Sequence, residues 1–250
     1  MPPRVAVVIP VRFGSTRFPG KPLAALNGRP MVEHVYRRAS AARSAAAVIV
    51  ATDDERIRAA VAAFGGDARM TSASHASGTD RVAEVAASLD CDIVVNVQGD
   101  LPLIEPGTID DVVGALADDP SLPMSTIRRR LDDPDAITDP NIVKVVVAPD
   151  GDALYFSRAP IPFNRDGRAA AVWKHIGLYA YRRTFLLELT RLTPTPLERT
   201  EALEQLRVLE HGYRIRAVET AEDSIEVDTP QDLERVRQRL AAGQPLRQPV

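Results

Sequence analysis

The sequence predicts an α/β fold, a three-layer sandwich of helices around a mostly parallel sheet, with a smaller β-rich excursion. Apolar runs rich in β-branched residues at 5–9, 46–51 and 92–97 have the length of buried strands. Segments with helical spacing separate these runs, and such alternation is typical of parallel sheets with right-handed crossovers. Because 45% of the 250 residues are hydrophobic, the chain can build one full core, and we expect a single domain over residues 1–250.

Local signals place the elements of the N-terminal half. Pro10 is expected to end the first strand, and Pro30 stands at the first position of a helix. Thr52 is the expected cap of the next helix, whose first turn is acidic. A short strand follows at 68–70, and a further helix is expected from about Thr79, with this threonine as its cap.

The second half of the chain is richer in strand-like segments. Residues from about 125 to 180 are expected to extend the sheet and to form the excursion, which we interpret as a lid. Asp150-Gly151 lies between two apolar runs and indicates a hairpin. A helix is predicted over 197–211, a strand over 214–219, and a last helix beginning at Thr229-Pro230.

Composition excludes several classes of protein. A net charge of −3 argues against nonspecific nucleic-acid binding, which needs a basic surface. The single cysteine, Cys91, excludes an internal disulfide and a cysteine-based zinc cluster. No segment approaches the roughly 20 apolar residues of a membrane span, and the N-terminus lacks the apolar region of a signal peptide. We therefore expect a soluble, cytoplasmic protein with neither nucleic-acid nor membrane partners.

The loop after the first strand carries the clearest functional signal. Within VAVVIPVRFGSTRFPGKP it combines cations, hydroxyls and glycines, namely Arg12, Gly14, Ser15, Thr16, Arg17, Gly20 and Lys21. Open α/β sheets bind ligands at the carboxyl ends of their strands, and these groups are phosphate ligands. Neither a Walker motif nor a G-x-G-x-x-G turn is present. The loop predicts a phosphate site of another kind; the alternative is an ordinary basic surface loop.

Two aspartates are candidates for a metal site. Asp100 follows a strand in NVQGD, and Asp228 precedes the last helix in IEVDTPQDL. A carboxylate at the end of a central strand is well placed to hold Mg²⁺ against nucleotide phosphates. The alternative for both residues is a role in a turn or a helix cap. The sequence does not decide between one metal ion and two.

Beyond these patterns, the whole chain resembles the 3-deoxy-manno-octulosonate (Kdo) cytidylyltransferase family, the CMP-Kdo synthetases. The resemblance is carried, in order, by IPVRFGSTRFPGKPL, ATDDERI, SHASGTDRVAEV, VVNVQGD, YFSRAPIPF, KHIGLYAYR, LEQLRVLEHGYRI and VDTPQDLERVR. It implies a Rossmann-like nucleotide-binding sheet with a sugar-binding excursion, a homodimer, and Mg²⁺ as cofactor. The implied reaction converts CTP and Kdo to CMP-Kdo and diphosphate for lipopolysaccharide biosynthesis.

The resemblance also implies roles for individual residues. Asp100 and Asp228 match the metal ligands, and with Arg12 and Lys21 on the phosphates they are the predicted catalytic residues. Nucleotide binding is expected from Ser15, Thr16, Ser77, Gly78, Thr79 and Arg81. Sugar-acid binding is expected from Gln98, Arg158, His175, Tyr179, Glu204 and Gln205. Of these, Arg158 suits a bidentate pair with the sugar carboxylate. His175 and Tyr179 lie in one expected strand and point to the same face.

Two positions depart from the family's pattern. Leu101 stands where an acidic residue usually follows the metal aspartate, and Glu226 stands where glycine usually precedes VDTP. Another sugar acid, such as 8-amino-Kdo or a sialate, is therefore an alternative substrate. A nucleotide-sugar-dependent glycosyltransferase is a second alternative, although the D-x-D triplets here fall before a strand, in a loop and in a hairpin turn. A non-catalytic nucleotide-binding protein is the third.

Overall fold

A computed structural model describes residues 2–14, 18–167 and 171–241 of the chain. The strands of its main sheet are β1 (Val5–Val11), β4 (Ala45–Thr52), β5 (Asp67–Met70), β6 (Ile93–Val97), β7 (Met124–Leu131), β8 (Lys144–Val147), β9 (Ala153–Ser157), β10 (Val172–Arg182) and β11 (Ile215–Thr220). A separate two-stranded sheet pairs β2 (Ala25–Leu26) with β3 (Arg29–Pro30).

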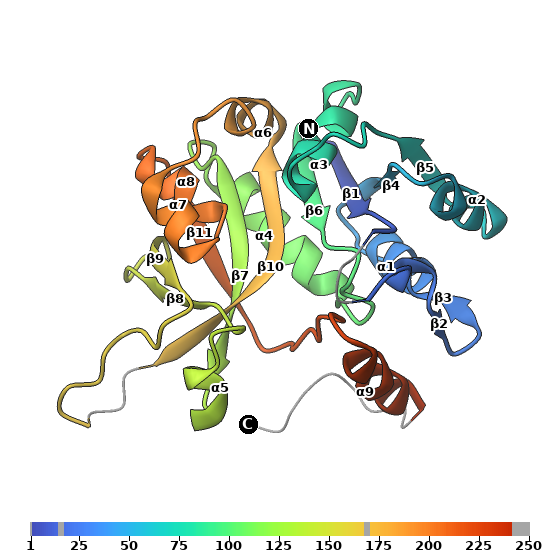
Figure 1. Ribbon diagram of the computed structural model, residues 1–250. Helices are drawn as coiled ribbons and strands as arrows, with labels where there is room; N and C mark the ends of the chain where they lie inside the picture. The colour runs from blue at the N-terminus through green and yellow to red at the C-terminus, as the bar shows by residue number, and fades with distance from the viewer. Residues whose placement is uncertain (1, 15–17, 168–170, 242–250) are drawn as a thin grey trace.

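The main sheet is largely parallel. Its order is β11-β7-β10-β6-β1-β4-β5, with β8 paired to β10 and to β9. Along this order β10 is antiparallel to both of its neighbours, whereas the other adjacent strands are parallel. The sheet therefore has the predicted α/β character, and β8 and β9 form the small β excursion at one side (Figure 1).

Helices connect the strands. They are the 3-10 turn η1 (Lys21–Leu23) and α1 (Met31–Ser40), α2 (Glu55–Ala63), α3 (Gly78–Ala87), α4 (Pro106–Asp118), α5 (Pro134–Thr138), α6 (Arg183–Leu189), α7 (Pro196–Glu201), α8 (Gln205–Glu210) and α9 (Pro230–Ala241). None of the helices in the described ranges is long and apolar enough to cross a bilayer.

Strand β1 shows how the layers form. Val7 and Ile9 belong to a buried cluster that includes side chains of α1 and α4, whereas Val8 belongs to a second cluster with side chains of α3 and α6. Successive residues of a strand face opposite sides of a sheet, so a continuous apolar run requires cover on both faces. The three-layer sandwich follows from this pattern.

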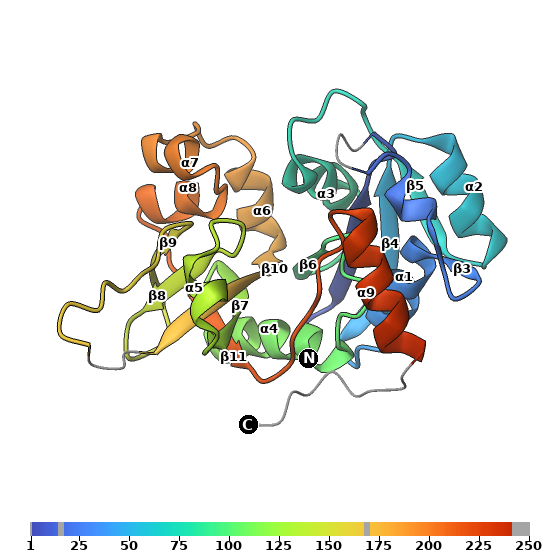
Figure 2. The ribbon, with the colours of Figure 1, turned by 60° about the horizontal axis from the view of Figure 1, so that its bottom comes forward.

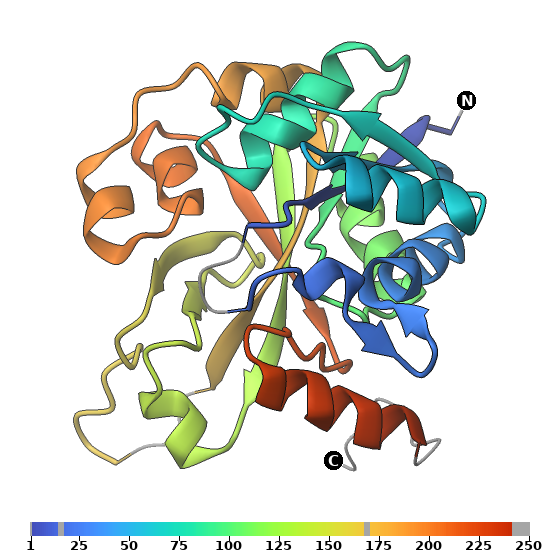
Figure 3. The ribbon, with the colours of Figure 1, turned by 45° about the vertical axis from the view of Figure 1, so that its right-hand side comes forward.

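The C-terminal helix α9 returns to the N-terminal half of the molecule. After β11 the chain crosses to that half, where α9 lies beside the first elements (Figures 2 and 3). Leu233 of α9 packs in a third buried cluster with Leu26 and Met31, and Arg237 Nη2 donates to the carbonyl of Ala25 at 2.6 Å. The crossing segment therefore carries Asp228 past the carboxyl end of β6.

Several predicted boundaries are wrong by a residue or more. Pro10 lies inside β1, where it pairs with β4 after the pairing to β6 has ended at Val8, and a proline is tolerated at such a one-sided position. Helix α1 begins at Met31, and Pro30 precedes it as the cap. Thr52 is the last residue of β4, and the carboxylate of Asp54 caps α2 instead.

Two further helix predictions need correction. Ser77, not Thr79, caps α3, because its hydroxyl accepts the N–H of Asp80 while the Asp80 carboxylate accepts the N–H of Ser77. The helix expected over 197–211 is two helices, because Ala202 adopts a left-handed φ of 52° between α7 and α8. The hairpin at Asp150-Gly151 is confirmed, since β8 and β9 pair antiparallel around it.

Candidate active site

The loop after β1 is folded back by a left-handed glycine. Gly20 has φ 74°, and its N–H donates to the carbonyl of Phe13 at 3.0 Å. A Cβ on Gly20 would meet the Phe13 ring at 3.1 Å, so both the conformation and the contact favour glycine. η1 begins directly after this turn, which directs Lys21 inward. The predicted ligands Ser15 and Thr16 lie outside the described residues.

Lys21 lies between the two predicted metal ligands. Its Nζ is 2.8 Å from Asp100 Oδ2 and 3.4 Å from Asp228 Oδ1, and it also donates to the carbonyl of Val227 at 2.8 Å. The N–H of Val227 in turn donates to the carbonyl of Asp100 at 2.9 Å. The crossing segment before α9 is thus fixed to the end of β6, and three predicted residues from distant parts of the sequence meet at one point.

A polar cavity of about 390 Å³ opens beside this point. The predicted residues that line it are Arg12, Ser77, Gly78, Arg81, Gln98 and the Lys21–Asp100–Asp228 group. Gly99 forms part of its wall, and a Cβ there would lie 2.9 Å from Val11 Cγ2 and 3.1 Å from the carbonyl of Pro10. Only glycine lets the NVQGD turn lie this close to β1, and both segments line the cavity at this point.

The α3 end of the cavity is held by ion pairing. The side chain of Arg81 is buried, and its Nη2 is 2.8 Å from Asp53 Oδ2 while its Nη1 donates to Thr71 Oγ1. Arg81 therefore joins α3 to the ends of β4 and β5 as well as lining the cavity. The hydroxyl of Thr79 does not face the cavity, because it donates to the carboxylate of Glu204.

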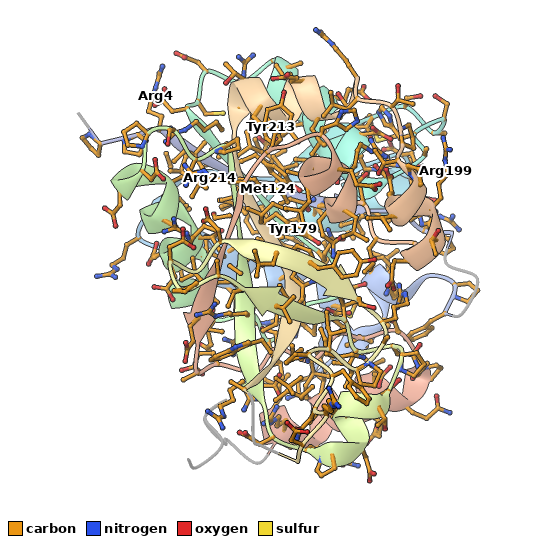
Figure 4. All side chains as sticks on the ribbon, turned by 90° about the vertical axis from the view of Figure 1, so that its left-hand side faces the viewer. Arg4, Met124, Tyr179, Arg199, Tyr213 and Arg214 are labelled. Atoms are coloured by element: carbon orange, nitrogen blue, oxygen red, sulfur yellow. The ribbon has the colours of Figure 1, made fainter. Side chains whose placement is uncertain are left out.

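A second cavity, of about 670 Å³, lies on the other side of the two aspartates. Its lining includes Gln98, Arg158 and Tyr179 among the predicted sugar-binding residues, together with Asp100 and Asp228. A neighbouring hollow of about 740 Å³ reaches His175 and Gln205 and shares Tyr179 and Asp228. The aspartate pair thus stands where these spaces meet. In Figure 4 Tyr179 is labelled near the middle of the view, whereas Arg4 and Arg199 lie toward its edges.

The side chain of Arg158 is held from two directions. Its Nε donates to the carbonyl of Glu201 at 2.9 Å, and its Nη1 donates to the carbonyl of Pro140 at 3.1 Å. The Glu201 carboxylate accepts the backbone N–H of Arg158 and the hydroxyl of Ser157. Helix α7 and the segment before β8 therefore fix the guanidinium at the wall of the second cavity.

His175 and Tyr179 meet, as predicted, although a register shift between Ile176 and Tyr179 interrupts β10. Their ring centroids are 5.5 Å apart. The hydroxyl of Thr126 donates to the carbonyl of Leu178 at 2.8 Å, which leaves it to accept the Nε2–H of His175 at 3.0 Å. Burial lowers the pKa of His175 to about 3, so its ring is neutral at ordinary pH.

Glu204 and Gln205 differ in what they face. Gln205 is buried and borders the neighbouring hollow of about 740 Å³. The carboxylate of Glu204 instead accepts a hydrogen bond from the hydroxyl of Thr79 on α3. Burial raises the pKa of Glu204, and hydrogen bonds from Thr79 and Ser77 oppose that rise. Glu204 therefore connects the expected sugar side of the site with the expected nucleotide side.

The two departures from the family pattern have different surroundings. Leu101 is fully buried in the first core cluster, so this position contributes to packing. Glu226 borders the second cavity. Desolvation first, and then the charges of Asp100 and Asp228, raise its pKa above the ordinary value of a glutamate. Neither position disturbs the contact of Lys21 with the two aspartates.

Sequence reasoning missed Lys144 and Glu201. Lys144 is fully buried, and Glu201 receives hydrogen bonds from Ser157 and Arg158. Lys144 interrupts the apolar run IVKVVV, and nothing in that run indicates which backbone groups surround the ammonium. For Glu201 the one available signal is its place in a short polar helix beside the predicted Glu204.

Comparison with known proteins decides the family. The cytidylyltransferase family profile matches residues 6–216. The chain is 54% identical over 253 residues to the 3-deoxy-manno-octulosonate cytidylyltransferase of Geobacter metallireducens, covering 96% of this chain and 99% of the relative. The chain belongs to the 3-deoxy-manno-octulosonate cytidylyltransferase family. It is therefore a nucleotidyltransferase, and the glycosyltransferase and non-catalytic alternatives are wrong.

Other members of the 3-deoxy-manno-octulosonate cytidylyltransferase family agree. The enzyme of Solibacter usitatus is 54% identical over 244 residues, covering 97% of each chain. A solved structure of CMP:2-keto-3-deoxy-manno-octonic acid synthetase complexed with CTP superimposes with a TM-score of 0.93 at 45% identity, covering 96% of this chain and 100% of that one. The fold predicted from the sequence is thus the fold of this family.

Proposed function

We propose that this protein transfers the cytidylyl group of CTP to the anomeric hydroxyl of Kdo, releasing CMP-Kdo and diphosphate. The anomeric oxygen forms a bond to the α-phosphorus as the bond from that phosphorus to the α–β bridging oxygen breaks. The bridging oxygen leaves with the diphosphate, and the hydroxyl proton passes to solvent water. The observation that carries the proposal is the position of Lys21, Asp100 and Asp228 where two polar cavities meet. The names of the relatives and of the CTP-bound neighbour support this reaction.

CTP is proposed to occupy the smaller cavity. Its lining combines the cations Arg12 and Lys21 with the N-terminus of α3 at Ser77 and Gly78. Helix N-termini and cations both favour phosphate oxygens. An acidic sugar must approach an anionic triphosphate, so these groups lower the repulsion and align the α-phosphate for attack. Base selection is assigned to the loop before α3 and to the first turn of that helix, where Arg81 is held by Asp53.

The residues present fit Mg²⁺. Proteins commonly bind this ion through one or two carboxylates, with substrate phosphates and water completing the coordination. Asp100 and Asp228 supply two carboxylates at the boundary of the cavities, and no cluster of three or more potential ligands occurs among the described residues. When bound, the ion would neutralise phosphate charge. Lys21 holds the two carboxylates in place and supplies a cation within reach of the same phosphates.

The sugar acid is proposed to occupy the second cavity, which Arg158 lines. Arg158 presents its guanidinium at the wall, and the pairing of its Nε and Nη1 with backbone carbonyls fixes its direction. The sugar carboxylate is its proposed partner. Gln98 and Tyr179 supply donors and acceptors for hydroxyls in this cavity. His175, as a neutral group, and Gln205 supply them from the neighbouring hollow. Glu204 is proposed to act between the two substrates.

The oligomeric state of the protein and its location in the cell stay predictions. The β-rich subregion over about 125–180 exposes Leu154 and Phe163, whose exposed fractions are 62% and 86%. Apolar side chains this open are candidates for burial in a homodimer, and sedimentation of the intact protein measures its mass directly. A cytoplasmic location is also proposed, since the substrates named for the relatives, Kdo and CTP, are small molecules.

A diphosphate-release panel tests the proposed function. CTP, UTP and ATP are each combined with Kdo, 8-amino-Kdo and a sialic acid, with and without Mg²⁺. We expect release only with CTP, Kdo and Mg²⁺ together. Release with another sugar acid at equal or higher kcat/KM would overturn the choice of Kdo, and release with none of them would overturn cytidylyl transfer.

A further inference from the structure

Lys144 lies in an environment that lysine rarely occupies. It is the first residue of β8, a strand held between β10 and β9, and its side chain is fully buried. Its Nζ donates to the carbonyls of Asp139 at 2.9 Å, Ile142 at 2.6 Å and Arg158 at 2.5 Å. An ammonium has three protons to donate, so its hydrogen-bonding capacity is filled by backbone oxygens from two separate segments.

Those two segments form a wall of the second cavity, the proposed site of the sugar acid. Pro140, Asn141 and Val143 line it from the segment between α5 and β8, and Arg158 lines it from the end of β9. The Arg158 guanidinium also donates to the carbonyl of Pro140. Lys144 thus ties together, from behind, the two pieces of backbone that carry the side chains facing the sugar space.

Burying an ammonium costs desolvation free energy, so a lysine at this position is expected to have a specific role. Burial lowers the pKa of Lys144, although the charge of Asp139 opposes that shift. A hydrophobic residue would suit the interior of β8 better if packing were the only demand. The ammonium and its three carbonyl partners instead join the two backbone segments rigidly. A displacement of about 1 Å in segments that position a substrate can lower the catalytic rate by up to roughly 100-fold.

We propose that Lys144 is a positioning residue for the acidic sugar, acting through the backbone at Asp139–Ile142 and the guanidinium of Arg158. This inference rests on the proposed function, which places the sugar carboxylate at Arg158. Lys144 itself touches neither substrate. Its effect is therefore confined to binding and alignment of the sugar, and the nucleotide cavity on the other side of Asp100 does not depend on it.

Arg182 provides the matched control. Its guanidinium also donates to three backbone carbonyls, those of Leu122 at 3.0 Å, Leu116 at 2.6 Å and Asp119 at 3.0 Å. These carbonyls lie at the end of α4 and before β7, away from the cavities beside Asp100 and Asp228. Arg182→Met therefore removes the same kind of cation, one bound to three backbone carbonyls, without touching the proposed sugar site.

The test compares Lys144→Met with Arg182→Met by steady-state kinetics and thermal unfolding. We expect both variants to lose stability, but Lys144→Met alone to raise KM for Kdo by about 10- to 100-fold, with KM for CTP changed less than about twofold. In an Arg158→Met background the effect of Lys144→Met should largely disappear, because the two residues act on the same contact. Lys144→Gln, which keeps a shorter donor, should show a smaller selective rise and serves if the methionine variant does not fold.

The outcomes distinguish the positioning role of Lys144 from the proposed function. Equal rises in both KM values, or a full effect of Lys144→Met in the Arg158→Met background, would overturn the positioning role and leave cytidylyl transfer intact. A wild-type protein that releases no diphosphate from CTP with any sugar acid would overturn the proposed function itself.

Discussion

The ammonium of Lys21 lies 2.8 Å from the carboxylate of Asp100, although the two residues belong to different loops of the sheet. The same ammonium is 3.4 Å from Asp228, so one cation is shared by two carboxylates that would otherwise repel each other. The site is therefore assembled before any ligand enters. Because one ammonium lies between two carboxylates, Lys21 is expected to affect both phosphate binding and metal binding.

Replacing Lys21 with methionine should abolish turnover without unfolding the protein. The variant loses the cation proposed to face the phosphates and leaves Asp100 and Asp228 without their shared partner. We expect kcat to fall by about 100-fold or more, as for the removal of one charge-stabilising donor in other enzymes. Lys174→Met is the control, because Lys174 pairs with Asp223 at 3.4 Å rather than with the aspartate pair. Equal losses in the two variants would contradict a specific role for Lys21.

Removing one carboxylate of the pair should weaken the response to Mg²⁺. Asp100→Asn and Asp228→Asn each delete a proposed ligand, so we expect the Mg²⁺ concentration for half-maximal activity to rise by about tenfold or more. The matched variant is Asp223→Asn, since Asp223 borders the neighbouring hollow but pairs with Lys174 and Arg129. Titrating Mg²⁺ after treatment with a chelator provides the measurement. Unchanged Mg²⁺ dependence in both aspartate variants would place the metal elsewhere.

The cap of α3 should affect stability and CTP binding together. Ser77→Ala removes the hydroxyl that accepts the N–H of Asp80, which is expected to cost about 1 kcal/mol in the free energy of unfolding. Because Ser77 also lines the smaller cavity, we expect a several-fold rise in KM for CTP. Asp54→Ala removes the equivalent cap of α2 and should lower stability alone. If the two variants have the same KM for CTP, the α3 terminus is not part of the nucleotide site.

The sequence allowed some of this site to be predicted, and the reasons are physical. Lys21 and Asp100 follow buried strands, where residue type and position alone indicate a ligand site. The link from Thr79 to Glu204 joins segments far apart in the chain, and no local pattern encodes such a contact. Lys144 was missed for a related reason, because a lysine is ordinarily expected to face solvent and its three carbonyl partners come from two separate segments. The break at Ala202 likewise depends on tertiary packing, which overrides helical periodicity.

The buried imidazole of His175 should make the protein sensitive to acid. Its pKa is lowered to about 3 in the folded state by burial, whereas an unfolded histidine binds a proton near pH 6.5. The unfolded state therefore binds more protons between these values, so the free energy of unfolding falls as the pH decreases through this window. The loss approaches about 1.4 kcal/mol per pH unit below 6.5.

A stability titration of His175→Gln isolates this contribution. The glutamine keeps a donor for Thr126 but cannot take up a proton in this range, so its free energy of unfolding should fall less between pH 7 and pH 5 than that of the wild type. Denaturant unfolding at each pH gives the difference between the two proteins directly. His211→Gln, at an exposed histidine that contacts the carbonyl of Thr193, is the control for replacing a histidine outside the core. Parallel pH curves for wild type and His175→Gln would show that the ring takes up a proton in the folded protein as readily as in the unfolded one, which would contradict its neutral role beside Tyr179.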